Sequence, residues 1–218
     1  NEIFVVEDSK ENPYLNILKE KGENFQINPD LDDELFQFIS EVYASPGVSR
    51  EHEIFAYAKK HKIKVTSDIE KFLEINQSLK ILVTGTNGKT STCLLIDSLF
   101  RNFFPELNIS VLGNIGKPVL SSIEEDMDIS IIEVSSFQLE LLNEVRFDIG
   151  VLLNIEQDHM DIHSSYEDYE KIKYSILEKS LFKISYDNNS VLPKNTFCFK
   201  DLELPKGLID SKIFKHWP

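Results

Sequence analysis

The stretch ILVTGTNGKTS at residues 81–91 decides the fold of this chain. An apolar run of strand length breaks into a glycine-rich turn, and the turn ends in Lys-Thr-Ser ahead of a helical pattern. Proteins use a strand, a glycine-rich turn, a lysine and a helix, in that order, to cradle a polyphosphate. The sequence therefore predicts a phosphate-binding loop, followed by a helix over residues 90–103 with Leu94, Leu95, Ser98 and Leu99 on one face.

The residues of this loop have separate expected roles. Gly85 and Gly88 let backbone N–H groups turn inward, and Lys89 supplies a positive charge. Thr90 offers a hydroxyl oxygen to Mg²⁺. The general loop pattern has glycine where this chain has Val83, which indicates a narrower family of loops. The expected nucleotide-binding residues are Gly85, Thr86, Asn87, Gly88, Lys89, Thr90, Ser91 and Asn154.

Composition excludes some classes of protein. The 218 residues are 41% hydrophobic and 28% charged, as in ordinary globular proteins, and the formal net charge is -14. An acidic chain offers no basic face to nucleic acid, so we expect none as a partner. No apolar run has the length of a membrane span, and no signal peptide opens the chain. With two cysteines that lack metal-ligand spacing, we expect a reduced, cytoplasmic protein. We also expect a monomer.

Strand and helix patterns alternate along the chain, which indicates an α/β fold. We expect an incomplete Rossmann-like domain over residues 1–77 and a doubly wound, mostly parallel phosphate-loop domain over residues 78–218, with a linker at residues 76–78. Expected strands in the first domain are 3–6, 41–44 and 63–65, and expected helices are 14–21, 50–61 and 67–72. In the second, strands are expected at 80–84, 109–112, 128–134, 147–154 and 182–185, with helices near 119–124 and over 166–181.

Three loops that carry reactive side chains leave three of these strands. The phosphate loop leaves the first, Glu133 ends the run SIIEV, and Asn154 and His159 follow the run GVLLN. Ligands gather at the carboxyl ends of parallel strands, so these groups are expected to converge around two Mg²⁺ ions and nucleotide phosphates. Taken singly, Glu133 could equally be a helix cap, and His159 an ordinary loop histidine.

Lys173 falls inside an apolar stripe of the helix expected at residues 166–181. Tyr169, Ile172, Ile176 and Leu177 make up the rest of that stripe. The helix pattern alone favours a lysine that lays its stem on apolar surface and keeps its ammonium in water. The alternative is an amine that is neutral enough to add CO₂ and become an anionic carbamate.

Several segments together resemble one family. The loop GTNGKTS, with a non-glycine residue two positions before it, resembles the ATP-dependent Mur ligases and the related folylpolyglutamate synthetase. EVSSFQLE at 133–140 and LNIEQDHMD at 153–161 are similar to the branch of Mur ligases that adds D-glutamate. GNIG at 113–116, SPGV at 45–48 and SDIEKF at 67–72 fit that branch in the same order, and the resemblance covers residues 3–190.

The resemblance implies an ATP-dependent amide-forming ligase of peptidoglycan precursor synthesis. Its substrates would be UDP-N-acetylmuramoyl-L-alanine, bound by the first domain, and D-glutamate, joined through an acyl phosphate. The catalytic residues would be Lys89, His159 and Lys173. Thr90 and Glu133 would hold one Mg²⁺, and His159 and a carbamylated Lys173 a second. The substrate-binding residues would be Ser9, Lys10, Gly47, Asn114, Ser135 and Gln138.

Family members carry a strand and glycine-rich turn ahead of the strand expected at residues 3–6, and they continue into a third domain. We therefore expect this chain to be a fragment that does not complete ligation alone. One alternative inside the class is another Mur-type or folylpolyglutamate ligase, which SSFQLE argues against. A second alternative is a non-catalytic nucleotide-binding module that uses the loop as a switch.

Overall fold

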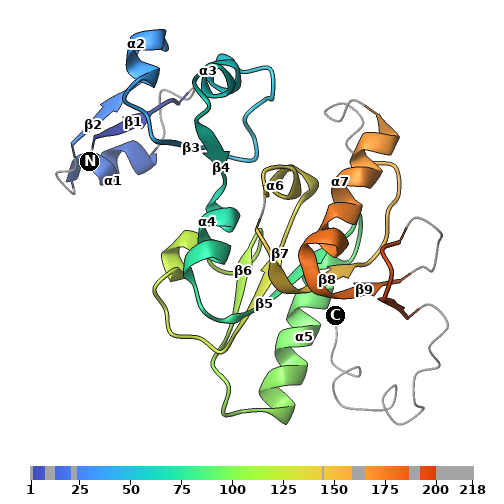
Figure 1. Cartoon of the computed structure of the whole chain (residues 1–218). Helices are drawn as coiled ribbons and strands as arrows, with labels where there is room; N and C mark the ends of the chain where they lie inside the picture. Colours follow the sequence, from blue (N-terminus) through green and yellow to red (C-terminus); the bar gives the residue numbers. More distant parts are fainter. Residues whose placement is uncertain are drawn as a thin grey trace. The chain divides into compact units, whose positions relative to one another are not determined.

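The structure is a computed structural model, which describes residues 2–7, 13–20, 24–143, 145–158, 165–186 and 192–199 (Figure 1). The chain divides into two compact units. The first holds residues 1–42 and 49–65, and the second holds residues 43–48 and 66–218. Among the described residues, no helix combines the length and the apolar character needed to cross a membrane.

The first unit is small. A two-stranded parallel sheet pairs Ile3 with Phe25 and Val5 with Ile27. Its apolar core centres on Phe36, Val42 and Ala58, and the Phe36 and Tyr57 rings stack with centroids 5.0 Å apart. The elements of this region are β1 (Ile3–Val5), α1 (Pro13–Glu20), β2 (Phe25–Ile27), α2 (Asp33–Phe36), β3 (Glu41–Tyr43), α3 (Glu53–His61) and β4 (Lys64–Thr66), with β3 and β4 forming a second two-stranded sheet.

A six-stranded sheet is the centre of the second unit. All its neighbouring strands pair in parallel, in the order β10-β9-β8-β5-β7-β6, which confirms the doubly wound α/β prediction. The strands are β5 (Leu79–Thr84), β6 (Ile109–Gly113), β7 (Ile129–Glu133), β8 (Phe147–Leu152), β9 (Ser180–Ser185) and β10 (Thr196–Cys198). The helices are α4 (Asp68–Ile75), α5 (Lys89–Phe103), a 3₁₀ helix (Val119–Ser122), α6 (Ser136–Glu140) and α7 (Tyr166–Lys179).

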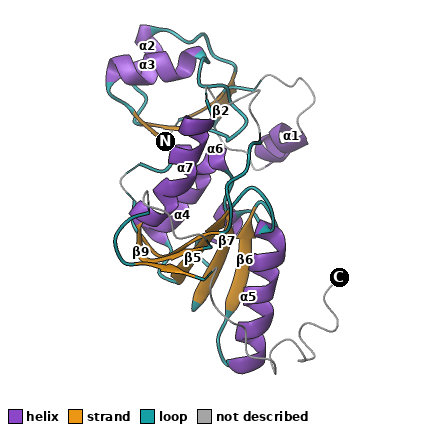
Figure 2. Cartoon of the chain, turned by 90° about the vertical axis from the view of Figure 1, so that its right-hand side faces the viewer, coloured by secondary structure: helices purple, strands orange, loops and turns teal. Residues whose placement is uncertain are grey.

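Helices cover both faces of this sheet, as continuous apolar strands require. Figure 2 shows α5 on one face and α4 on the other. Two separate apolar clusters match the two faces. One joins α4, α6 and α7 to alternate strand residues such as Leu82 and Ile132, and the other joins α5 to Val83 and Ile131.

The buried face of α5 differs from the predicted one. Cys93, Ile96 and Phe100 pack against the sheet, whereas Leu94 is 45% exposed. The helix begins at Lys89, whose side chain turns back into the phosphate loop. Cys93, Ile96 and Phe100 follow Lys89 by one, two and three turns and lie on the sheet side, about one residue away from the face that carries Leu94, Leu95, Ser98 and Leu99.

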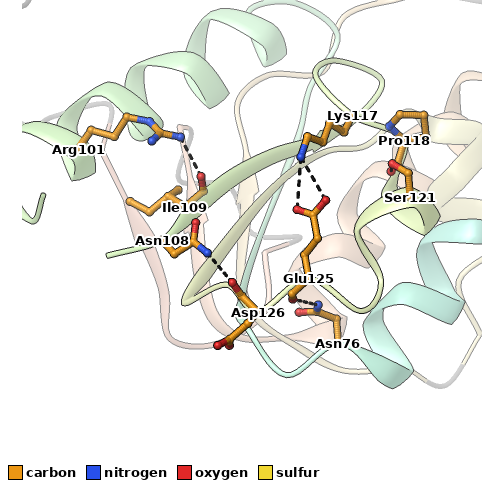
Figure 3. Close-up of polar contacts among 9 residues, drawn as sticks. All are labelled: Asn76, Arg101, Asn108, Ile109, Lys117, Pro118, Ser121, Glu125 and Asp126. Atoms are coloured by element: carbon orange, nitrogen blue, oxygen red, sulfur yellow. Dashed lines mark hydrogen bonds and ion pairs between the residues drawn. The ribbon is translucent and has the colours of Figure 1, made fainter. Parts of the chain in front are cut away.

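The segment 66–78 packs with the second compact unit, which includes residues 66–218. Figure 3 shows the reason at Asn76, which is 6% exposed. Its side-chain amide donates to the backbone oxygens of Ile123 and Glu125, and its Oδ1 accepts from Ser78 N at 2.9 Å. The polar side chains of Asn76 and Ser78 are therefore buried in turn contacts. Residues 76–78 do not act as a linker.

The turn after β6 depends on Gly116, and replacing Gly116 with alanine should be strongly destabilising. Gly116 has φ +69°, and an added Cβ would lie 2.2 Å from the backbone oxygen of Val111. Gly116→Ala is expected to lower the free energy of unfolding in urea by about 2–4 kcal/mol, through a left-handed conformation plus a clash with rigid backbone.

Gly47→Ala is the matched control, because nothing lies within 4 Å of an added Cβ there. That variant should stay within about 0.5 kcal/mol of the wild type. Equal stability of the two variants would contradict the assignment of strain to Gly116.

Candidate active site

The ends of three neighbouring strands form the site. Val83 of β5 pairs with Glu133 of β7, and Thr84 pairs with Leu152 of β8. The carboxyl ends of these strands therefore lie at one level, with the phosphate loop leaving the middle strand. The order of the strands makes this edge the switch point of the sheet, where open α/β folds bind ligands.

The phosphate loop ends at an uncapped helix. Gly88 is the N-cap of α5, with φ 80° and no side-chain cap, so the first N–H groups of the helix lack the usual side-chain acceptor. Lys89 Nζ donates to the backbone oxygens of Gly85 and Thr86, both at 2.9 Å. An uncapped helix start beside an ammonium group is a site for a negatively charged ligand.

Thr90 and Glu133 meet beside this helix start. The Thr90 hydroxyl donates to Glu133 Oε2 at 2.7 Å, and Glu133 is 5% exposed. A hydroxyl and a carboxylate oxygen are ligands that fit Mg²⁺. The charge of Glu133 also acts on Cys93, since burial first and Glu133 second raise the pKa of the Cys93 thiol to about 12.

Lys173 is buried beneath the loop, with 2% of its surface exposed. Its Nζ donates to Thr84 Oγ1 at 3.1 Å and to Gly85 O at 3.0 Å, so it shares the Gly85 oxygen with Lys89. The prediction of a solvent-exposed ammonium is therefore wrong. Burial, and secondly the charge of Lys89, lower the pKa of Lys173 to about 7, although Asp158 opposes this shift.

This pKa predicts a pH-dependent stability. The pKa of Lys173 is about 7 in the folded chain and 10.5 ordinarily, so the folded chain binds fewer protons between those pH values. The free energy of unfolding then rises with pH across this window. Below about pH 7 Lys173 is protonated in both states, so the folded chain carries the full free-energy cost of burying a charged ammonium. From pH 7 to 10, the unfolding free energy of wild type minus that of Lys173→Met should rise by at most about 1.4 kcal/mol per pH unit.

Urea unfolding in metal-free, CO₂-free buffer measures this difference. Lys171→Met, which removes an exposed amine from the same helix, is the control and should keep the wild-type pH dependence. A difference between wild type and Lys173→Met that stays constant from pH 7 to 10 would contradict the burial of this amine.

The residues expected to bind the muramoyl-alanine substrate lie in the loops that follow β6 and β7. Asn114 N donates to Glu133 O at 3.3 Å, which holds the loop after β6 against the end of β7. Ser135 and Gln138 form a capping box at the start of α6, where Gln138 Oε1 accepts from Ser135 N at 2.9 Å. The structure thus gives Ser135 and Gln138 a capping role, and their contact with substrate stays a prediction.

Ser9, Lys10 and His159 lie outside the described residues. Gly47 is described, in an open segment of the second unit. Where the structure describes the chain, no three His, Cys, Asp or Glu side chains gather as a metal site. The described candidates for metal ligands are the Thr90 hydroxyl, the Glu133 carboxylate and Lys173, the last only as a carbamate.

The sequence reasoning missed residues that act through buried hydroxyls. Thr84 accepts from Lys173 and donates to Val134 O at 2.8 Å, so it orients the lysine. The Tyr169 hydroxyl lies 3.1 Å from Thr86 Oγ1, and the Lys173 ammonium lies 5.3 Å from the centroid of its ring. Thr84 could have been indicated by its position, because it is a polar residue at the end of an apolar strand.

The parallel sheet, its switch point and the uncapped helix after the loop define an α/β domain of the phosphate-loop class. A family model described as the Mur ligase middle domain matches residues 83–194. The chain therefore belongs to the Mur ligase family.

Curated relatives named UDP-N-acetylmuramoylalanine--D-glutamate ligase match much of the chain. The protein from Wolbachia pipientis wMel is 46% identical over 146 residues, which are 65% of this chain and 28% of that protein. The one from Aquifex aeolicus is 36% identical over 172 residues, 75% of this chain and 40% of that protein. The chain thus spans between 28% and 40% of the length of these relatives.

A solved structure agrees on the fold. The UDP-N-acetylmuramate:L-alanyl-gamma-D-glutamyl-meso-diaminopimelate ligase from Neisseria meningitides matches with a TM-score of 0.52 and 14% identity. The match covers 86% of this chain and 64% of that structure. At this identity it supports the α/β architecture alone.

Proposed function

We propose that the protein in which this sequence occurs joins D-glutamate to UDP-N-acetylmuramoyl-L-alanine, using ATP, in peptidoglycan precursor synthesis. The pairing of Thr90 with Glu133 beside the Lys89 loop carries this proposal, because it supplies a metal site where phosphates would lie. The printed names of the relatives support the choice of substrates. Since the reaction consumes ATP and a nucleotide-linked sugar, a cytoplasmic location follows.

The proposed reaction has two steps. A carboxylate oxygen of the muramoyl-alanine substrate attacks the γ-phosphorus of ATP, which gives an acyl phosphate and releases ADP. The D-glutamate amine then attacks the acyl carbon, loses a proton and expels phosphate, which forms the amide. Charge on the transferred phosphoryl group has to be neutralised, and we assign this role to Lys89 and to the N–H groups at the start of α5.

Thr90 and Glu133 would hold one Mg²⁺, which when bound supplies charge neutralisation at the phosphates. Their hard oxygen atoms, 2.7 Å apart, fit that ion. We assign His159 and a carbamylated Lys173 to a second ion. The buried amine with a pKa of about 7 supports this assignment, since a neutral amine at physiological pH is the form that adds CO₂.

The remaining roles follow the family resemblance. We assign Asn114, Ser135 and Gln138 to the muramoyl-alanine end of the substrate. Ser9, Lys10 and Gly47 would hold the UDP end, so the region up to residue 77 would act as the nucleotide-sugar domain and residues 78–218 as the ATP domain.

A substrate panel tests the proposal. The protein in which this sequence occurs is supplied with Mg-ATP, D-glutamate and one of three acceptors: muramoyl-alanine nucleotide, a muramoyl-tripeptide precursor, or a folate. Amide product is expected with the first acceptor alone. Product with the tripeptide or the folate in its place would refute the choice of substrate, and ATP binding without any product would favour a non-catalytic module.

A further inference from the structure

The segment that follows β8 holds one side of the phosphate loop. Thr86 N donates to Asn154 O at 3.0 Å, which extends the backbone contact between the two strand ends. The Asn154 side chain continues it, because Oδ1 accepts from Asn87 N at 2.8 Å and Nδ2 donates to Asn87 O at 3.1 Å. One amide side chain thus pairs with both backbone groups of a loop residue, as a neighbouring strand would.

The Thr86 hydroxyl makes a second set of contacts with the same segment. Thr86 Oγ1 accepts from Glu156 N at 2.9 Å and donates to Glu156 O at 3.2 Å. The hydroxyl has one proton, so the Tyr169 hydroxyl at 3.1 Å is the donor in the remaining contact. Asn87 Nδ2 adds a bond to Glu156 Oε2 at 3.2 Å.

The two backbones are also packed closely. A Cβ added at Gly85 would lie 3.0 Å from Leu153 Cβ and 3.4 Å from Asn154 N. A side chain at this position would require the loop or the segment to shift by a few tenths of an ångström. Backbone contact, side-chain pairing and close packing therefore all hold the phosphate loop against residues 153–156.

We propose that Thr86 and Asn154 are positioning residues, which hold the phosphate loop against residues 153–156. The contacts run through Thr86, Asn87, Asn154 and Glu156, and this set is here called the loop clamp. The sequence had suggested that both residues bind the nucleotide. Instead, Asn154 takes the Asn87 N–H, so the anion is left to the N–H groups at the uncapped start of α5 and to Lys89. The consequence for nucleotide affinity rests on the proposed function.

The clamp also sets the spacing of the site. Residues 153–156 lead to Asp158, whose charge acts on Lys173, and Gly85 accepts from Lys173 directly. Fixing this segment to the loop therefore fixes the loop relative to the groups that surround Lys173.

Amide hydrogen exchange of this chain, followed by NMR without ligand, tests the clamp. The Asn87 amide should be protected in the wild type and should exchange about tenfold faster in Asn154→Leu, while the Leu82 and Val83 amides keep their protection. Asn143→Leu is the control, because Asn143 also bonds to backbone but precedes β8. That variant should leave Asn87 unchanged. Equal Asn87 exchange in wild type and Asn154→Leu would overturn the proposal.

Titration with Mg-ADP adds a second readout. Asn154→Leu and Thr86→Val should bind Mg-ADP about tenfold more weakly than wild type, whereas Thr86→Ser, which keeps the hydroxyl, should bind as wild type does. Weaker binding with unchanged Asn87 exchange would mean direct contact with the ligand, and would refute the clamp. Failure of the wild type to bind Mg-ADP would refute the proposed function, and the exchange data would still decide the clamp.

Discussion

Replacing Lys89 with methionine is expected to weaken Mg-ATP binding by about 100-fold, because charge-assisted hydrogen bonds to phosphate are each worth about 1.5–3 kcal/mol. Lys89 Nζ already lies inside the loop, where it donates to the Gly85 and Thr86 oxygens. A phosphate at the start of α5 would meet this ammonium without movement of the backbone. Calorimetric titration of wild type and Lys89→Met with Mg-ATP measures the effect.

Lys80→Met is the matched control for this prediction. Lys80 lies near the start of the same strand, and its ammonium also donates to a backbone oxygen, that of Ser78, at 2.8 Å. The substitution therefore removes a largely buried lysine from the opposite end of β5. Nucleotide affinity should change less than about twofold, within the range of substitutions away from a site. Similar losses in the two variants would mean that Lys89 acts on stability and not on the phosphates.

Glu133→Ala is expected to lower the turnover of the ligase reaction by at least about 100-fold, since it removes the carboxylate that would hold the metal beside the transferred phosphoryl group. Glu133 is buried, and its Oε2 accepts from Thr90. The measurement is the rate of ADP release by the protein in which this sequence occurs, with muramoyl-alanine nucleotide and D-glutamate present.

Glu125→Ala controls for loss of an acidic side chain. Glu125 forms an ion pair with Lys117 at 3.1 Å, and both residues lie in the connection between β6 and β7 (Figure 3). Its turnover should match that of the wild type. Full turnover in Glu133→Ala would refute the role of Glu133 as a metal ligand and would favour a module that only binds nucleotide.

The main architecture of the second unit could be predicted from the sequence, because its central strands carry unbroken apolar runs and its loop has a specific pattern. The short elements β2, α2, α6 and β10 were not predicted. They have three to five residues each, and segments this short carry too little periodicity to be found reliably from the sequence.

The candidate site was predictable to the extent that side chains sit at strand ends. Glu133 met Thr90 as expected, because adjacent parallel strands end at one level. Lys173 was the failure of pattern reasoning, since a lysine in an apolar stripe usually reaches water. Here Thr84 and Gly85 accept hydrogen bonds from its Nζ under the loop, and these partners lie 89 and 88 positions away in sequence. No periodicity within one helix contains that information.

The most direct test of a single metal–nucleotide pocket uses Mn²⁺ in place of Mg²⁺ with ADP, because the paramagnetic ion broadens NMR signals of nearby groups. The account predicts that Mn-ADP selectively broadens signals from Thr90, Glu133 and Lys173. Signals from Lys80 and Ser78, near the start of β5, should stay sharp. Broadening that centres near the start of β5, or that spares Glu133 while it affects the loop, would contradict the account.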